Sequence, residues 1–389
     1  MTMTKQFDVI VVGGALVGAS AAVALAKQGI SVALVDRKLP TFTAESDEVW
    51  DSRIYAISPG NADWLKALNV WQAMPPNRIA PIGAMQIWTN ENPVPLLFNA
   101  DEAHAENLGY ILENSCLHQA LWQTIKTLDI ETFEADTQHL NFAEDFAHLA
   151  LKDGAHLKAN LIVGADGGNS WVREQAGLSQ QKTVYEHEGV VANFETELPH
   201  HGIARQWFVE NGILAWLPLP GHRISMVFST KHAQDLMAMS AEALSDYVAQ
   251  VGVHALGNMR CITPAAAFPL VKQKASAFIA PRLALVGDAA HQVHPMAGQG
   301  VNLGFRDVVA LVHTLSARHP AADVGDYLLL RRYERSRKAD VLGMQSLTHG
   351  LYGLFDSHHP SVKAFRNWAL RLPNHYPMIK RALMRNALI

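Results

Sequence analysis

The N-terminal part of the chain combines two short apolar runs with a helix-forming stretch. Phe7–Val12 is rich in β-branched residues, and Ala19–Lys27 consists mostly of strong helix formers. Gly29 ends the helical pattern, and a second apolar run, Ser31–Val35, leads to Asp36. Continuously apolar strands are typical of a parallel sheet that helices cover on both faces. The pattern predicts a strand, a helix and a second, parallel strand.

The same stretch also has the hydropathy of a membrane segment. Val9–Ala26 contains 18 residues without a charged side chain, and Lys5 precedes it, as in a signal peptide or a short transmembrane helix. Gly13, Gly14 and Gly18 interrupt the run where a strand would turn into a helix. We therefore prefer the strand–helix–strand interpretation.

A different pattern, in the middle of the chain, indicates antiparallel strands. Three strand-like segments within residues 205–229 are separated by Asn211–Gly212 and Pro220–Gly221, which are typical turn sequences. Residues 82–89 and 94–98 predict a further hairpin in the same sheet.

These elements predict a mixed α/β (α+β) fold with a discontinuous domain. The chain has 389 residues, 49 % of them apolar and only 17 % charged, which is enough for a large core in two or three domains. We expect a Rossmann-like nucleotide-binding domain, an antiparallel-sheet substrate domain inserted into it, and C-terminal helices. The expected ranges are 1–75, 101–180 and 273–340 for the nucleotide-binding domain, 76–100 and 181–272 for the substrate domain, and 341–389 for the C-terminal helical region.

Charge and cysteine content exclude several classes of protein. With 32 Lys and Arg against 36 Asp and Glu, the net charge of −4 argues against a general electrostatic nucleic-acid binder. Cys116 and Cys261 are far apart in the chain, so they neither form a metal cluster by themselves nor staple a secreted domain. We expect a cytoplasmic protein with no metal site and no nucleic-acid partner.

A glycine-rich turn follows the first predicted strand. It matches the dinucleotide-binding pattern G-x-G-x-x-G at Gly13 and Gly18, but the middle position is Ala15. Gly14 and the following helix offer backbone N–H groups and a positive dipole end to phosphates. Asp36, at the end of the second strand, is placed to bind ribose hydroxyls. A dinucleotide site is the preferred interpretation, and a glycine-rich turn in an α/β sheet is the alternative.

Two further motifs lie at the ends of predicted strands. Leu161–Gly168 is an apolar strand that runs into a tight turn with Asp166. Residues 283–286 form another apolar strand, which ends in Gly287–Asp288. A glycine-rich loop at residues 298–300 then opens a helix.

In this order, the three motifs resemble those of the FAD-dependent aromatic hydroxylases of the p-hydroxybenzoate hydroxylase type. The most specific segment, residues 287–304, reads G-D-A-A-H-x-x-H-P-x-x-G-Q-G-x-N-L-G. The likeness is greatest to the ubiquinone-biosynthesis hydroxylases of the UbiH/UbiF/VisC-like group. It covers nearly the whole chain and implies FAD as the cofactor.

The resemblance implies roles within the FAD site. The glycine turn and Asp36 would hold the ADP half, Asp166 would serve flavin and nicotinamide binding, and Asp288 would hold the ribitol chain. Backbone N–H groups at the start of the last helix would face the flavin pyrimidine ring, where a helix N-terminus stabilises negative charge. Arg53 matches an arginine beside the flavin, but it could equally cap a helix or pair with Asp51. The expected FAD-binding residues are Gly13, Gly14, Ala15, Gly18, Asp36, Arg53, Asp166, Asp288, Gly300, Val301 and Asn302.

The chain departs from the family pattern at two positions. Ala15 replaces the usual glycine, and His118 stands where these hydroxylases often carry glutamine. Both departures bear on contacts to the ADP half and leave the use of FAD itself untouched.

Catalytic candidates lie in the loop that follows Asp288. His291, His294 and Pro295 would sit near the flavin ring, where the histidines could move protons or orient the substrate. The alternative is that both histidines are satisfied by hydrogen bonds within the loop. The H-x-x-H spacing is poor evidence for zinc, because no third ligand is placed.

The resemblance implies a monooxygenase that uses NAD(P)H and O₂. The expected substrate is lipophilic and aromatic, a polyprenylated phenol or quinol intermediate of ubiquinone biosynthesis. One alternative is a hydroxylase of a small soluble aromatic acid, and another is a non-catalytic flavin-binding subunit of a biosynthetic assembly.

The end of the chain is purely basic. Beyond Asp356 there is no acidic residue, whereas six Lys and Arg side chains alternate with aromatic ones. A docked helix with a solvated basic face is one interpretation, and peripheral contact with an anionic membrane at its inner, cytoplasmic face is the other. Partners in a biosynthetic complex, or further copies of the chain, are also possible.

Overall fold

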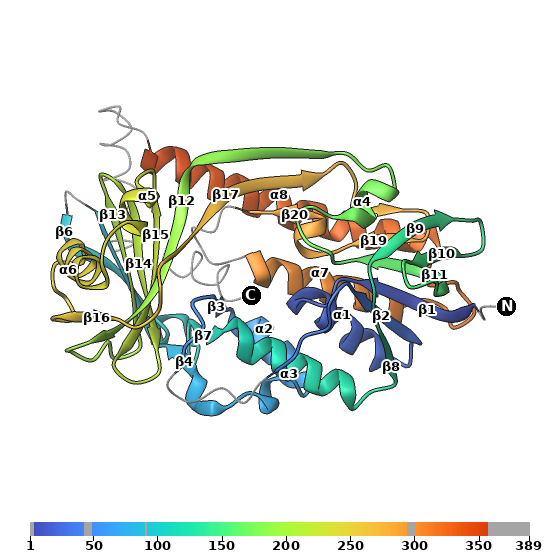
Figure 1. Ribbon diagram of the computed structural model, residues 1–389, viewed down its shortest axis with the longest axis horizontal. Helices are drawn as coiled ribbons and strands as arrows, with labels where there is room; N and C mark the ends of the chain where they lie inside the picture. The colour runs from blue at the N-terminus through green and yellow to red at the C-terminus, as the bar shows by residue number, and fades with distance from the viewer. Residues whose placement is uncertain (1–3, 43–48, 90–91, 294–299, 357–389) are drawn as a thin grey trace.

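The computed structural model describes residues 4–42, 49–89, 92–293 and 300–356, which form two lobes around three β-sheets (Figure 1). One lobe contains an eight-stranded sheet and the N-terminus, and the other contains most of a nine-stranded sheet. A three-stranded sheet lies between them. This arrangement confirms the mixed α/β fold.

The eight-stranded sheet has a parallel centre. Its order is β18 (Ile279–Ala280), β19 (Leu283–Leu285), β11 (His156–Gly164), β1 (Lys5–Val12), β2 (Val32–Asp36) and β8 (Ile130–Glu134); β10 (Ala147–Leu151) and β9 (Thr137–Phe142) extend it antiparallel from β11. β1 is parallel to both β2 and β11. With α1 (Leu16–Ala26) between β1 and β2, the predicted strand–helix–strand unit is confirmed.

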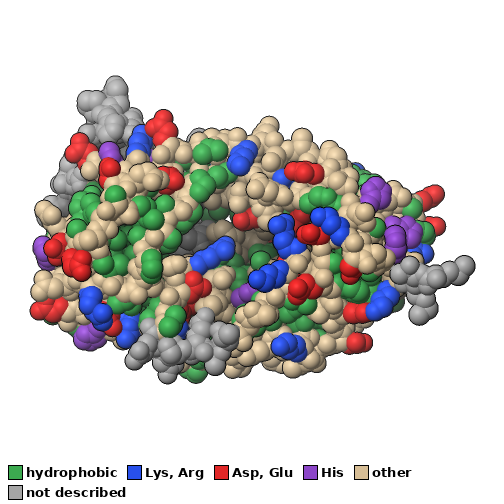
Figure 2. Space-filling view, in the orientation of Figure 1, with side chains coloured by type: hydrophobic (Ala, Val, Ile, Leu, Met, Phe, Trp, Pro, Cys, Tyr) green, Lys and Arg blue, Asp and Glu red, His purple; other side chains and the backbone are tan. Residues whose placement is uncertain are grey.

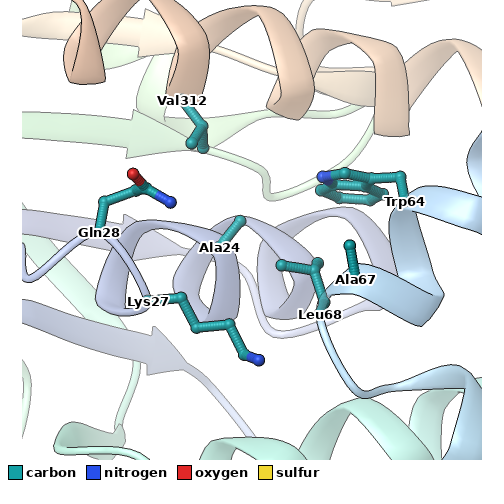
Figure 3. A pocket seen from close by; sticks show the side chains of 7 residues that line it. All are labelled: Ala24, Lys27, Gln28, Trp64, Ala67, Leu68 and Val312. Atoms are coloured by element: carbon teal, nitrogen blue, oxygen red, sulfur yellow. The ribbon is translucent and has the colours of Figure 1, made fainter.

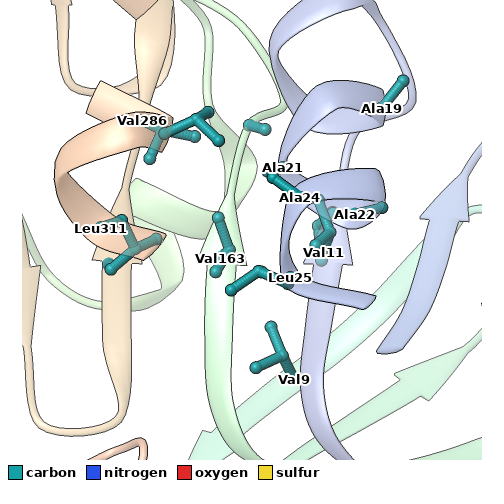
Figure 4. Packing of buried hydrophobic residues seen from close by; sticks show 14 of the residues in the cluster. Val9, Val11, Ala19, Ala21, Ala22, Ala24, Leu25, Val163, Val286 and Leu311 are labelled. Atoms are coloured by element: carbon teal, nitrogen blue, oxygen red, sulfur yellow. The ribbon is translucent and has the colours of Figure 1, made fainter. Parts of the chain in front are cut away.

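The helix α1 is buried at the centre of this lobe. It contacts α3 (Asn114–Lys126) and α7 (Gly300–Ser316), and α7 contacts α8 (Tyr327–Asp356). Figure 4 shows its small side chains, Ala21 and Ala24 among them, near Val163 of β11 and Leu311 of α7. A helix that is apolar on all sides is typically enclosed by protein or lipid. Burial in this core explains the long uncharged run of the sequence.

The nine-stranded sheet is largely antiparallel. Its order is β20 (His291–Gln292), β17 (Ala266–Ala275), β12 (Gln180–Thr196), β15 (Arg223–Thr230), β14 (Gly212–Leu219), β13 (Ile203–Val209), β5 (Ala84–Thr89) and β6 (Asn92–Asn99), with β16 (Met259–Cys261) beside β12. The predicted three-strand meander and the separate hairpin are confirmed as β13–β14–β15 and β5–β6. Within the described part of this sheet, only β13 and β5 pair in parallel.

Short elements complete the two lobes. α5 (Ala233–Met237) and α6 (Ala241–Val251) belong to the lobe of the nine-stranded sheet, and the three-stranded sheet is β3 (Ile54–Ile57), β7 (Gly109–Glu113) and β4 (Ile79–Ile82). The remaining elements are α2 (Pro59–Ala67), α4 (Trp171–Gln175) and the 3-10 turns η1 (Trp71–Ala73), η2 (Pro76–Arg78), η3 (Asp101–Ala103) and η4 (Gly287–Ala289).

Three of the expected domain limits fall inside elements, and the first of them, between 180 and 181, cuts β12 after its first residue. The limit between 272 and 273 cuts β17, which stays paired with β12 through Ala275. The limit between 340 and 341 cuts α8, a single helix. Long strands and helices pass from one lobe to the other, so changes of pattern in the sequence do not mark where a lobe ends. Residues 357–389 lie outside the described part.

Among the described residues, no helix combines the length and the apolar character that crossing a membrane requires.

Candidate active site

The eight-stranded sheet brings four predicted turns to one edge. β19, β11, β1 and β2 are parallel neighbours, and their register aligns the carboxyl ends of all four strands. Ligands of open α/β sheets bind outside this edge. Gly13, Asp166 and Asp288 lie in the turns that follow three of these strands, and Asp36 is the last residue of β2.

The turn after β1 requires glycine at two positions. Gly13 has a φ of +107°, and a Cβ atom there would lie 2.4 Å from the backbone oxygen of Ala165. A Cβ atom on Gly18 would lie 1.8 Å from the backbone oxygen of Gly13. Only glycines let the turn close, and the closed turn places the N-terminus of α1 at the sheet edge, where it can bind phosphate.

The alanine at position 15 fits this turn without strain. Ala15 is the N-cap of α1, is exposed, and has a φ of −72°, which is ordinary for any residue. Its methyl group therefore does not strain the fold, and it adds bulk at the N-terminus of α1, where a pyrophosphate would bind. The N–H of Gly14 donates to Oδ2 of Asp36 over 2.6 Å, so the expected ribose-binding carboxylate lies at the same turn.

His118 and Trp122 of α3 contact the other side of this turn. Nε2 of His118 lies 2.9 Å from the carbonyl oxygen of Gly14, and Nε1 of Trp122 donates to the same oxygen over 3.0 Å. Burial lowers the pKa of His118, and this effect outweighs the hydrogen bond to Gly14 and the nearby charge of Asp36. The residue that replaces the family's glutamine thus packs its imidazole against the turn, and burial there favours the neutral form.

Asp166 caps α4. Its carboxylate accepts a hydrogen bond from Oγ of Ser170 over 2.6 Å and another from a backbone N–H of α4 over 3.0 Å, while burial raises its pKa. Nearby, the buried guanidinium of Arg173 donates to the carbonyl oxygens of Gly168 and Ala289, each over 3.0 Å. Arg173 therefore ties the turn after β11 to the turn after β19.

Asp288 is exposed at the sheet edge, within η4. Its Oδ2 accepts a hydrogen bond from Nε2 of Gln292 over 2.9 Å. Nε2 of Gln345, on α8, donates to the carbonyl oxygens of Gln273 and Gln292 over 3.0 and 3.2 Å. The carboxylate can reach a ligand while α8 and β17 hold the turn in place.

The first turn of α7 is fixed through a buried asparagine. Oδ1 of Asn302 accepts hydrogen bonds from the N–H of Ser58 over 3.0 Å and from Nδ2 of Asn61 over 2.9 Å, and its Nδ2 donates to the carbonyl oxygen of Ala56 over 2.7 Å. The buried Oγ of Ser58 has no hydrogen-bond partner among the described residues. Because the first backbone N–H groups of a helix have no acceptor within that helix, this end of α7 suits a ligand that carries negative charge.

A buried ion pair orients the segment that carries Arg53. Nε of Arg78 lies 2.8 Å from Oε2 of Glu113, and Oε1 of Glu113 accepts a hydrogen bond from the N–H of Asp51 over 2.6 Å. Oδ1 of Asp51 then accepts from the N–H of Arg53 over 2.8 Å. Asp51 therefore binds the main chain of Arg53. The exposed guanidinium lies 5.5 Å from the ring centre of Tyr55.

His291 is buried beneath the turn that carries Asp288. Its side chain is 2 % exposed, and Nε2 lies 2.7 Å from Oδ2 of Asp307. Asp307 also accepts hydrogen bonds from the N–H of Gly287 over 2.9 Å and from Nε of Arg337 over 2.7 Å. This burial favours the alternative interpretation, in which His291 is satisfied by a hydrogen bond and positions the neighbouring turn, and a catalytic role of His291 stays a prediction. The other two catalytic candidates, His294 and Pro295, lie outside the described residues.

These features fit FAD. The glycine turn and the N-terminus of α1 suit a pyrophosphate, Asp36 a ribose, Asp288 the ribitol chain, and the start of α7 the pyrimidine ring. Burial raises the pKa of Tyr55, and the guanidinium of Arg53, 5.5 Å from the centre of its ring, acts in the opposite direction. Figure 2 shows a hollow between the two lobes, with Lys and Arg side chains at its rim and hydrophobic side chains beside it.

A pocket of about 450 Å³ lies elsewhere, between α1, α2 and α7 (Figure 3). Its lining consists of Ala24, Lys27, Gln28, Trp64, Ala67, Leu68 and Val312. It borders the C-terminal end of α1, whereas the glycine turn precedes the N-terminal end. The pocket is therefore separate from the candidate active site.

Several residues that shape the site were absent from the sequence-based prediction. Glu113, Arg78, Arg173, Asp307 and Arg337 are all buried and charged. One signal was available: Asp307 interrupts the apolar side of α7, and Arg337 interrupts that of α8. A charge in an apolar stripe indicates a buried partner.

Comparisons with known proteins agree with this geometry. Residues 6–344 match the family described as the FAD binding domain. The 3-demethoxyubiquinol 3-hydroxylase of Escherichia coli is 35 % identical, over 99 % of this chain and 100 % of that protein. The human mitochondrial ubiquinone biosynthesis monooxygenase COQ6 is 30 % identical, over 97 % and 92 %. The crystal structure of the p-nitrophenol 4-monooxygenase PnpA from Pseudomonas putida has a TM-score of 0.78 at 17 % identity, over 99 % of this chain and 98 % of that one.

The similarity extends over the parts of the chain that build the site. The matched family region begins within β1 and ends within α8, so it spans the turns at the sheet edge and the elements between them. The chain therefore belongs to the FAD-binding-domain family, as one of its flavin-dependent aromatic-ring monooxygenases that use FAD with NAD(P)H and O₂.

Proposed function

We propose that the protein hydroxylates the aromatic ring of a polyprenylated phenol or quinol intermediate of ubiquinone biosynthesis. Its curated relatives are named as ubiquinone-biosynthesis hydroxylases. The observation that carries the proposal to this chain is an apolar strip on the nine-stranded sheet, which suits a lipophilic substrate.

The strip crosses five neighbouring strands. Register pairs Val191 with Val227, Val227 with Ala215, Ala215 with Gln206, and Gln206 with Ile87. Residues opposite each other in register point to the same face of a sheet. Four of the five side chains are apolar and partly exposed, and Gln206 is the single polar group.

The strip lies on the face of the sheet that turns toward the segment carrying Arg53, an expected FAD-binding residue. Asn193, two residues after Val191 on β12 and therefore on the same face, donates from Nδ2 to the carbonyl oxygen of Asp51 over 2.8 Å. Asp51 in turn holds the main chain of Arg53. The opposite face is closed, because Trp207, Trp216 and Phe228 pack there in the core that includes α6.

The protein's part in the reaction is binding, orientation and exclusion of water. The strip would hold the prenyl chain by burial of apolar surface, and Gln206 would orient a ring oxygen by a hydrogen bond. The N-terminus of α7 would stabilise negative charge at the pyrimidine ring of the flavin. FAD, when bound, supplies the transfer of electrons from NAD(P)H and the activation of O₂.

A turnover experiment tests this function. The FAD-loaded protein is supplied with NADPH or NADH, ¹⁸O₂ and one of three substrates: a prenylated phenol, the same phenol without its prenyl chain, or a hydroxybenzoate. We expect one ¹⁸O atom in the product of the prenylated phenol and a far lower kcat/KM for the other two.

Two other outcomes would contradict the proposal. A preference for the hydroxybenzoate would identify a hydroxylase of a small aromatic acid. Bound FAD that neither nicotinamide reduces would identify a non-catalytic flavin-binding subunit.

We further propose that the protein works at the cytoplasmic face of a membrane. A prenylated substrate resides in the lipid phase, and the basic residues that follow Asp356 favour contact with anionic lipid. Assembly with other biosynthetic proteins or with copies of itself is compatible with this location.

A further inference from the structure

The solvent-facing side of α8 has an unusual composition. Its exposed residues include Leu328, Arg331, Arg332, Arg335, Ala339, Leu342 and Ser346. At 100° per residue these seven fall within a sector of roughly 100°, which makes them one stripe along the helix. We call this stripe the α8 basic face. The opposite side of α8 is buried against the core through residues such as Tyr333 and Val341.

The three arginines of the α8 basic face have no carboxylate partner among the described residues. The acidic residues of α8 in this stretch, Glu334 and Asp340, lie outside the stripe and are engaged elsewhere. Oε1 of Glu334 accepts hydrogen bonds from the N–H of Phe278 and from Nζ of Lys338, each over 2.9 Å. Asp340 binds Arg337 and Arg306. The face therefore carries three uncompensated positive charges on a protein whose net charge is −4.

Large apolar side chains accompany these charges. Leu328 is 68 % exposed and Leu342 is 46 % exposed, and they lie near the two ends of the stripe. Tyr327, beside Leu328, is 46 % exposed. A helix face that combines arginine with exposed leucine and tyrosine matches the interface of a bilayer, where the apolar groups enter the headgroup region and the guanidinium groups bind phosphate.

We propose that the α8 basic face binds the surface of an anionic membrane. The inference rests on the proposed function, because a substrate dissolved in lipid requires the enzyme at the bilayer. The inference goes beyond that function by naming the surface of the protein that contacts the membrane. Exposed leucines near both ends distinguish this face from one that binds an acidic protein through charge alone. Leucine side chains contribute to the free energy of binding only where their apolar surface is buried.

A vesicle experiment tests the proposal with the FAD-loaded full chain. Binding is measured by flotation with vesicles of phosphatidylcholine alone and of phosphatidylcholine with about 30 mol % phosphatidylglycerol. We expect binding only to the anionic vesicles, with a steep decrease as salt rises. In the variant Arg331→Gln/Arg332→Gln/Arg335→Gln we expect the partition coefficient to fall roughly a hundredfold, from the three lost charges.

A matched variant controls for total charge. Lys126→Gln/Lys152→Gln/Lys182→Gln removes three exposed positive charges at positions outside α8, and we expect it to bind anionic vesicles within about twofold of the wild type. Because all six positions are exposed, an unchanged flavin spectrum and melting temperature would verify folding.

Three results would overturn the proposal. They are absence of wild-type binding to anionic vesicles, undiminished binding of the arginine variant, and equal loss in both triple variants. If the wild type does not bind anionic vesicles but still hydroxylates a prenylated phenol, the proposed membrane contact is refuted and the proposed enzymatic function stands. If the protein binds anionic vesicles but does not hydroxylate the prenylated phenol, the proposed enzymatic function is refuted and the membrane contact stands.

Discussion

Oδ2 of Asp307 lies 2.7 Å from Nε2 of His291, and both side chains are buried. Asp307 lies on α7 and His291 on β20, and the same carboxylate reaches Arg337 on α8 and the N–H of Gly287 in η4. Burial alone would raise the pKa of Asp307, but the charges of His291 and Arg337 and their hydrogen bonds outweigh it and lower that pKa. One ionised carboxylate thus joins these elements behind the turn that carries Asp288.

Asp307→Asn is expected to lower the free energy of unfolding by about 3 to 5 kcal/mol, because it removes the buried carboxylate that pairs with Arg337 and His291. It should also weaken FAD binding, since the Gly287 turn loses its anchor. Urea unfolding and fluorescence titration of the deflavinated protein with FAD measure the two effects.

Asp340→Asn is the matched control for this change. Asp340 also binds Arg337, over 2.6 Å, but its side chain is 32 % exposed, so we expect a loss of about 1 kcal/mol or less. Equal effects of the two substitutions would show that the buried network does not set the position of the turn.

Local patterns predicted most of the frame of this site. The β1–α1–β2 unit, the β13–β14–β15 meander and the glycine turn were predicted because hydrophobic period and turn residues act over a few neighbouring positions. Gly13 and Gly18 follow from steric contact within one turn, which any Cβ atom would prevent. Such signals are contained in short stretches of sequence.

The charged network could not be predicted in the same way. Arg78 and Glu113 are separated by 35 positions, and Asp307 and Arg337 by 30. Pairing over such separations depends on how the elements pack, which no local pattern encodes. His291 was a catalytic candidate because the resemblance implies that its motif lies near the flavin, whereas its burial against Asp307, which favours the alternative of a satisfied histidine, is a property of the packed fold.

Glu113→Gln is expected to release the segment that carries Arg53. It removes the charge partner of the buried Arg78, at a cost of about 3 kcal/mol, and weakens the bond that holds Asp51. FAD affinity should fall as well, measured by fluorescence titration. Glu195→Gln, which removes a partly exposed partner of Arg223, should change both quantities little, and a comparable loss in FAD affinity would contradict the assigned role of Glu113.

Ala15→Gly is expected to strengthen FAD binding several-fold. The substitution removes a methyl group at the N-terminus of α1, and glycine is accepted at an N-cap at least as well as alanine. Stability should change by no more than about 0.5 kcal/mol. Gly13→Ala, at a φ of +107°, should instead abolish folding or FAD binding. Weaker FAD binding in Ala15→Gly would show that the methyl group contacts the cofactor favourably.

His118→Gln is expected to alter how stability depends on pH. The folded state lowers the pKa of His118, so between that pKa and the ordinary value of about 6.5 the unfolded chain binds a proton that the folded chain does not. The wild type should therefore lose stability as pH falls below about 6.5, by up to about 1.4 kcal/mol per pH unit from this group, and keep it in full above.

Urea unfolding between about pH 5 and 8 measures this difference, since that range spans the ordinary pKa of histidine. The free energy of unfolding of His118→Gln should decrease less than that of the wild type as pH falls, because the contribution of His118 is absent. His139→Gln, at an exposed position on β9, should show the same pH dependence as the wild type. Parallel curves for the wild type and His118→Gln would show that His118 does not titrate differently in the folded state.

Val227→Asp is expected to separate binding of the prenyl chain from binding of the aromatic ring. Val227 lies within the apolar strip, between Val191 and Ala215, and a carboxylate there would lose its hydration when a prenyl chain covers it. We expect KM for a prenylated phenol to rise about tenfold or more, because the free energy lost is about that of burying one valine side chain. KM for the unprenylated phenol should change little. Val184→Asp on the neighbouring strand β12, at a side chain 61 % exposed, should leave both values unchanged. A parallel rise for both substrates in Val227→Asp would place the ring, and not the prenyl chain, against this strip.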